Sequence, residues 1–186
     1  MKKRMAIMMI MIIGILLLGC QIPMFNKPPA VNYPEDLKIT YHWDTGPLPP
    51  RYHYSYEIVI QTDSAGQFTY QQSYAGYGAP PLPSVTTFTM PPEKINQLYK
   101  LLLTKNMLRT EWAKRQPSIG GSSSDLQIVA DGKTFSIPND ALLVEKDKTD
   151  SAEVYDFIKN LVPQSIWDEM ANIRRQVDAA TDSPAQ

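Results

Sequence analysis

The sequence predicts an α+β domain in which helices cover one face of an antiparallel sheet of about five to six strands. Three observations predict this class. Apolar and polar side chains alternate in 37–44, 54–62 and 67–74, as they do in strands with one buried face. An Asp-Gly pair separates two further short apolar segments. Apolar residues recur at helical spacing in 92–106 and again after residue 150.

The second and third predicted strands are expected to form a hairpin. Ser64-Ala65-Gly66 suits a three-residue loop whose glycine adopts the left-handed conformation. This loop sets Ile60 opposite Tyr70 and Tyr56 opposite Tyr74, so that the apolar faces of the two strands coincide.

A short strand at 86–90 is expected to precede the first helix of the domain. Pro91 and Pro92 favour a helix start, because the first turn of a helix does not use the backbone donor that proline lacks. Asn106 is a suitable closing residue. Residues 107–116 are expected to add another helical turn or two.

Asp131-Gly132 predicts a second hairpin. This pair suits a type I′ turn of two residues. Its register sets Ile128 opposite Phe135 and Leu126 opposite Ile137.

The C-terminal region is expected to be helical. Asp150 and Glu153 have the spacing of a capping box, and apolar residues form a stripe along 154–162. Pro163 is expected to break the helix, and a second helical segment continues along 166–177.

The amino terminus has the features of an export signal. Lys2, Lys3 and Arg4 precede an apolar run, Met5–Leu18, of about 14 residues. A membrane-spanning helix needs about 20 such residues, whereas the core of a secretory signal needs about 7 to 15. The length therefore favours a signal peptide.

The end of this run, Leu17-Leu18-Gly19-Cys20, resembles the lipobox of bacterial lipoprotein signal peptides. Leu17, Gly19 and Cys20 match the family's pattern, and Leu18 departs from it, because alanine or serine is commoner there. The resemblance covers only about the first 20 residues. It implies cleavage before Cys20, a diacylglyceryl thioether on its sulfur and, in many bacteria, a further acyl chain such as palmitate. The alternative is an uncleaved helix in which Cys20 is buried as a small apolar side chain.

The resemblance also implies a location and a domain organisation. The protein would be attached through lipid on Cys20 to the cell membrane or the outer membrane, with its domain outside the cytoplasm. Residues 1–19 would be the signal peptide, 20–36 the lipidated cysteine and a proline-rich tether, 37–178 a single α+β domain, and 179–186 a disordered tail.

Charge and cysteine content argue against a nucleic-acid partner and against disulfide bonds. The chain has 18 basic and 19 acidic residues, and removal of the three basic residues at its start leaves a formal net charge of −4. No nucleic-acid partner is expected, because a basic surface is missing. The domain is expected to be held by its core alone, because Cys20 is the only cysteine of the chain.

The two histidines are the first candidates for catalysis or metal binding. If the first two strands are neighbours, His42, Asp44 and His53 come close together, and Asp63 is a further nearby carboxylate. Their spacing matches none of the common zinc patterns, so no metal and no cofactor is expected. Surface histidines without a catalytic role are the favoured interpretation. A hydrolase or metal-dependent enzyme that uses His42 or His53 with a nearby carboxylate is the alternative.

Tyrosine is concentrated in one part of the chain, since eight of the ten tyrosines lie between Tyr33 and Tyr77. Alternation assigns most of them to the core. Tyr74 and Tyr77 lie instead on a loop rich in glycine and proline, where they are candidates for binding a partner protein, a peptide or a glycan. The sequence thus favours a membrane-anchored lipoprotein that is a non-catalytic binding or structural module of the cell envelope.

Overall fold

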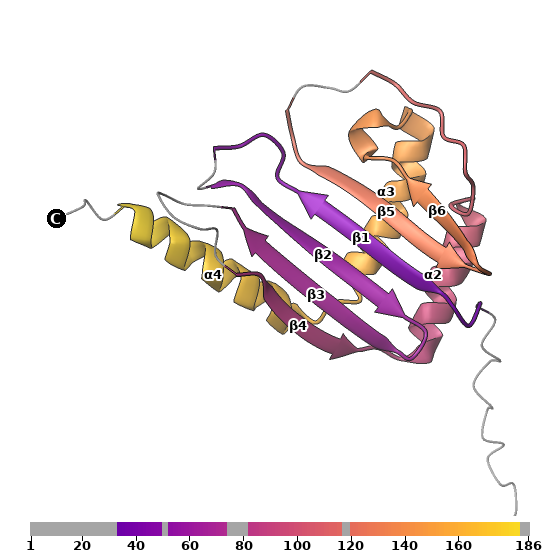
Figure 1. The fold of residues 1–186 in the computed structure, drawn as a ribbon, viewed down its shortest axis with the longest axis horizontal. Coiled ribbons are helices and arrows are strands. Elements are labelled where there is room, and N and C mark those ends of the chain that lie inside the picture. Colours follow the sequence, from indigo (N-terminus) through magenta and orange to yellow (C-terminus); the bar gives the residue numbers. More distant parts are fainter. Residues whose placement is uncertain (1–32, 50–51, 74–81, 117–119, 183–186) are drawn as a thin grey trace, which may run out of the picture. The chain divides into compact units, whose positions relative to one another are not determined.

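The computed structural model describes residues 33–49, 52–73, 82–116 and 120–182. The chain divides into two compact units, Met1–Ala30 and Val31–Gln186, and the first lies outside the described residues. In the second unit, six strands form one antiparallel sheet with the order β4-β3-β2-β1-β5-β6 (Figure 1). The strands are β1 (Lys38–Asp44), β2 (Tyr54–Gln61), β3 (Ala65–Gln72), β4 (Ser84–Thr89), β5 (Ser123–Ala130) and β6 (Lys133–Ile137).

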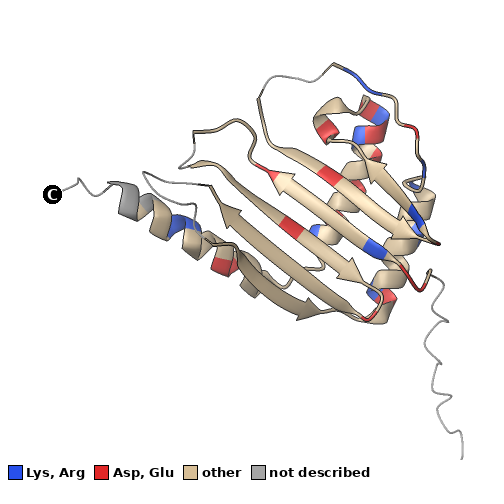
Figure 2. Cartoon of the chain, viewed as in Figure 1, with Lys and Arg blue, Asp and Glu red and all other residues tan. Residues whose placement is uncertain are grey.

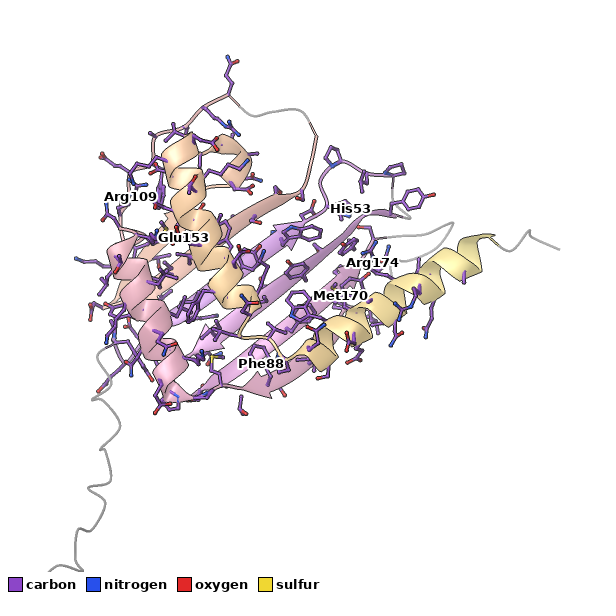
Figure 3. All side chains as sticks on the ribbon, turned by 180° about the vertical axis from the view of Figure 1, so that it is seen from behind. His53, Phe88, Arg109, Glu153, Met170 and Arg174 are labelled. Carbon is purple, nitrogen blue, oxygen red and sulfur yellow. The ribbon has the colours of Figure 1, made fainter. Side chains whose placement is uncertain are left out.

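Among the described residues, three α-helices accompany the sheet, and the predicted α+β class is confirmed. They are α2 (Pro92–Thr104), α3 (Glu145–Lys159) and α4 (Gln164–Asp182), and a short 3₁₀-helix, η2 (Asp140–Leu142), precedes α3. All three α-helices lie behind the sheet in Figure 1 and in front of it in Figure 3, which shows the molecule from the opposite side. The other face of the sheet is therefore free of α-helices in the described part of the chain.

Aromatic side chains connect α3 and α4 to the sheet. The ring of Tyr155 in α3 is centred 5.0 Å from that of Tyr41. Trp167 in α4 meets Tyr56 edge-on at 5.2 Å and Phe68 at 5.0 Å. Such tilted contacts suit the charge distribution of aromatic rings. Because these sheet residues point to one side, the core lies between the sheet and the helices.

The register of the first hairpin differs from the prediction. Tyr56 pairs with Tyr70 and Ile60 with Gly66, so the predicted partners Ile60–Tyr70 and Tyr56–Tyr74 are wrong. The partner of Tyr70 moves by four residues, an even number, and the apolar side chains therefore still share one face.

The loop of this hairpin explains the shift. β2 ends at Gln61 and β3 begins at Ala65, so the three connecting residues are 62–64 rather than 64–66. Ser64, with φ at 66°, takes the left-handed conformation that was expected of Gly66. Gly66 lies within β3, beside the ring of Phe88.

The second hairpin is as predicted. Ile128 pairs with Phe135 and Leu126 with Ile137. Both residues of the Asp131-Gly132 turn have positive φ, as a type I′ turn requires.

The segment after α2 is not helical, contrary to expectation. α2 begins at Pro92 as predicted, and Asn106 follows its end with φ at 53°. The next residues extend along the segment after η2: Lys114 forms a β-bridge with Leu143, and the N–H of Arg115 donates to the carbonyl of Leu142 at 2.8 Å. Backbone N–H and C=O groups that would bond to one another within a helix instead form hydrogen bonds between these two segments.

The start of α3 also differs from the prediction. The helix begins at Glu145, so Asp150 lies inside it and does not cap it. The carboxylate of Asp150 instead accepts from Lys146 at 2.5 Å and Lys105 at 3.4 Å. The predicted break at Pro163 is confirmed, because α3 ends before it and α4 begins directly after it. α4 continues to Asp182, past residue 178, where the predicted domain ends.

Candidate functional site

The sheet face opposite the helices, which we call the open face, carries mainly polar side chains. One row crosses all six strands through Ser136, Gln127, Thr40, Val59, Gln67 and Thr87. A neighbouring row contains Asp125, His42, Glu57, Thr69 and Val85. Figure 2 shows that charged residues are sparse on the strands. The first row therefore presents mainly hydroxyl and amide groups, whereas the neighbouring row carries the ionisable side chains of Asp125, His42 and Glu57.

His42 lies near the middle of the open face and has a carboxylate partner. Its Nδ1 is 3.3 Å from Oδ2 of Asp125 on the adjacent strand β5. The hydrogen bond with Asp125 raises the pKa of His42 above its usual value, although partial burial opposes this effect. The pair therefore favours the charged form of the imidazole.

Asp44, His53 and Ser73 form a second polar arrangement, which we call the edge cluster. Asp44 ends β1, His53 directly precedes β2 and Ser73 directly follows β3. Because these neighbouring strands are antiparallel, the three residues meet where the strands end, at one border of the sheet. His53 Nε2 is 3.0 Å from Asp44 Oδ2, and His53 Nδ1 is hydrogen-bonded to Ser73 Oγ. Figure 3 labels His53 at this edge. The imidazole thus connects a carboxylate to a hydroxyl.

Backbone hydrogen bonds fix the members of the edge cluster. The N–H of Ser73 donates to the carbonyl of His53 at 2.9 Å. The N–H of Gly46 donates to Asp44 Oδ1 at 2.6 Å, which leaves Oδ2 for the imidazole. Gly46 has φ at 78°, and a Cβ there would lie 2.0 Å from the carbonyl oxygen of Gly121. The turn that orients Asp44 therefore requires glycine at this position.

The two histidines do not share one site. β1 and β2 are neighbours, which was the condition for the candidate residues to meet, and Asp44 contacts His53. His42 is paired with Asp125 instead, and Asp63 accepts from the N–H of Ala65 in its own turn. Within the described residues, no group of three or more His, Cys, Asp or Glu side chains is placed to hold a metal ion.

The tyrosines of the strands mostly belong to the core. Tyr41, Tyr56 and Tyr70 are buried, and burial raises the pKa of Tyr41 to about 12. Tyr54 is half-buried beneath the guanidinium of Arg174, whose carbon lies 4.1 Å from the ring centre. Tyr74 and Tyr77, the predicted partner-binding residues, lie outside the described residues, as does Cys20.

A pocket of about 330 Å³ lies at the ends of β1 and β5. Small residues and backbone line most of it, including Gly46, Gly121, Ser122 and Asn139. It contains none of the residues that the sequence analysis selected as functional candidates.

Ser73 is the member of the edge cluster that sequence reasoning missed. The predicted register places Ser73 opposite Glu57. The observed register, continued by one residue beyond the Tyr54–Gln72 pair, places Ser73 opposite His53. Sequence spacing alone also carries little information, because serine, histidine and aspartate occur together in most chains of this size. Ser73 could have been identified as a partner of His53 only if the pairing register of β2 and β3 had been predicted correctly.

No family model matches the chain, and no curated protein matches it either. None of the described helices is long and apolar enough to cross a membrane.

Proposed function

We propose that this chain is a lipoprotein, attached to the cell membrane or the outer membrane through lipid on Cys20. The supporting observation is the order of the first 20 residues: three basic residues, an apolar core of signal-peptide length, and a cysteine directly after Leu17-Leu18-Gly19. Two or more acyl chains give stable membrane attachment without a spanning helix.

We further propose that the domain binds a partner protein of the cell envelope through its open face. The observation that carries this proposal is the polar row across all six strands, on the side away from the α-helices. Hydroxyl and amide side chains on a rigid sheet can supply many of the hydrogen bonds that protein interfaces contain, about one per 100–200 Å². None of the six side chains in this row is charged, which favours contact there with an equally polar, weakly charged surface.

The anchor is tested with Cys20→Ser. We expect the wild-type protein to incorporate labelled palmitate and to remain with membranes after a high-salt wash. The variant should incorporate none and retain its uncleaved signal segment. Equal labelling of both proteins would contradict the proposed anchor.

The open face is tested by photo-crosslinking in cells. A crosslinking side chain replaces Gln67 or Gln127 on the open face, and the matched control is Gln97, an exposed glutamine of α2. We expect one defined adduct from Gln67 and Gln127, and none from Gln97. Gln67→Arg should remove the adduct formed from Gln127, whereas Gln97→Arg should not. Adducts from all three positions, or from none, would contradict a specific interface on this face.

A further inference from the structure

We infer that the edge cluster is a hydrolytic site for carboxylic esters, with Ser73 as the nucleophile and His53 as the general base. Asp44 is the positioning residue. The inference is independent of the binding proposal, because it concerns the edge of the sheet rather than its centre. It revises the expectation of a domain without catalytic activity.

The connectivity of the edge cluster is that of an activated serine. A serine hydroxyl becomes a useful nucleophile when a neighbouring base accepts its proton and a third group orients that base. Asp44 Oδ2, 3.0 Å from His53 Nε2, selects the tautomer that carries the proton on Nε2. Nδ1 is then free to accept the hydrogen of Ser73 Oγ, with which it is in contact. The nitrogens have the opposite roles to those in chymotrypsin, but the proton path is equivalent.

The cluster is also held in place before any substrate arrives. Asp44 is fixed by the N–H of Gly46, and Ser73 by the carbonyl of His53. The N–H of His53 donates to the carbonyl of Pro49 at 3.2 Å. The side chains of Asp44 and His53 are 22% and 29% exposed, so the imidazole is shielded from water but reachable from the surface. Fixed geometry of this kind is what proximity effects in catalysis require.

The reaction is an acyl transfer to serine followed by hydrolysis. Ser73 Oγ attacks the ester carbonyl carbon while its proton passes to His53 Nδ1. The bond to the leaving alcohol breaks, and the alcohol takes that proton. Water then attacks the acyl-serine, giving its own proton to His53, and the carboxylic acid leaves as Ser73 regains its hydrogen.

Polar side chains adjoin the cluster where the strands pair. Ser55 pairs with both Asp44 and Gln71. The loop that carries His53 adds two exposed apolar side chains, Leu48 and Tyr52. A long acyl chain needs an apolar surface whereas an acetyl group does not, so an acetyl ester is the substrate used in the test.

The test uses the full chain in detergent with a fluorophosphonate probe. Reaction joins Ser73 Oγ to phosphorus and expels fluoride, and mass spectrometry locates the adduct. We expect the adduct on Ser73 and release of p-nitrophenolate from p-nitrophenyl acetate. Ser73→Ala and His53→Ala should lower the rate by about 100-fold or more. Asp44→Asn should lower it too, and Asp44→Glu should restore part of it.

The matched controls are Ser165→Ala, at an exposed serine of α4, and His42→Gln from the histidine–aspartate pair of the open face. Both should react like the wild-type protein. Free imidazole should restore activity to His53→Ala but not to Ser73→Ala. If His53 had only a structural role, free imidazole would not restore activity to either variant. Thermal unfolding verifies that each variant is folded. An unlabelled Ser73 in folded wild-type protein, or labelling that persists in His53→Ala without imidazole, would overturn the inference.

Discussion

The β2–β3 and β5–β6 hairpins both depend on glycine, but for different physical reasons. In the turn between β5 and β6, Gly132 has φ at 69°, and an added Cβ would meet no atom within 4 Å. In the first hairpin, Gly66 has no positive φ, but an added Cβ would lie 2.3 Å from the ring of Phe88. Gly132 is required because of its positive φ, and Gly66 because the ring of Phe88 leaves no room for a side chain.

This difference shows that a glycine does not by itself mark a turn. The left-handed position between β2 and β3 is occupied by Ser64, whose carbonyl accepts from the N–H of Met90 at 3.0 Å. Gly66 lies two residues further on, inside the strand, where close approach of a neighbouring ring is the usual reason for glycine. The following substitutions separate the two causes.

The largest effect is expected for Gly66→Ala. The new methyl group overlaps the ring of Phe88, which is buried at 8% exposure. Overpacking of a core typically lowers the free energy of unfolding by about 1–3 kcal/mol. Urea unfolding of the full chain measures the change.

A double-mutant cycle identifies the cause. Phe88→Leu alone removes part of a buried ring and should destabilise the protein. In the Phe88→Leu background, Gly66→Ala should be tolerated better than in the wild type, because the overlapping ring is gone. Equal losses in both backgrounds would show that Gly66 is needed for its backbone rather than for space.

A smaller loss is expected for Gly132→Ala. No atom obstructs the methyl group, so the loss comes only from the left-handed conformation, about 1–2 kcal/mol. Gly132→Asn is the matched control, because asparagine tolerates positive φ better than alanine does. Thermal unfolding should rank alanine below asparagine; the reverse order would contradict an effect of φ.

A small gain is expected for Ser64→Gly. Glycine relieves the strain of φ at 66°, but it also gives the unfolded chain more freedom. The net change should be a few tenths of a kcal/mol toward higher stability. Urea unfolding that shows a loss of 1 kcal/mol or more would mean that the side chain of Ser64 contributes an interaction of its own.

The predictability of the fold follows from the same contrast. Asp131-Gly132 permits one short turn, and the register of that hairpin could be predicted from the sequence. In the first hairpin, alternation fixes which face each side chain occupies but not which residues are opposite, since a shift of four residues keeps the faces. The ring of Phe88, which decides the position of Gly66, is more than twenty residues away in the sequence.

The candidate site was partly predictable for the same reason. Contact between Asp44 and His53 follows from the pairing of β1 and β2, which was the stated condition for these residues to come close together. The contact with Ser73 depends on the register of β2 and β3, which the sequence did not determine. The partner of His42 was not predictable either, because Asp125 comes from a strand that is adjacent only in the folded sheet.

The smallest effect is expected at Asp36, and it tests whether the turn at Gly132 depends on more than its backbone angles. The carboxylate of Asp36 accepts from the N–H of Gly132 at 2.7 Å and of Asp131 at 2.8 Å. The bond from Gly132 is the largest cause of a lowered pKa of Asp36. The turn between β2 and β3 is also bonded from outside its hairpin, but not by a carboxylate: the N–H of Met90 donates to the carbonyl of Ser64 at 3.0 Å, and the hydroxyl of Tyr33 donates to the carbonyl of Thr62 at 3.3 Å.

The direction of the pH effect follows from linkage. A carboxylate with a lowered pKa stabilises the fold above its unfolded value of about 3.9, and the contribution is lost as the pH falls through the lower folded pKa. Asp36→Asn should therefore be less stable than the wild type at pH 7, and the difference should shrink as the pH approaches about 2.5. Urea unfolding at both pH values measures it, and Glu35→Gln controls for the loss of a nearby negative charge. A difference that is the same at both pH values would mean that the carboxylate of Asp36 acts on the turn through its shape and not through its charge.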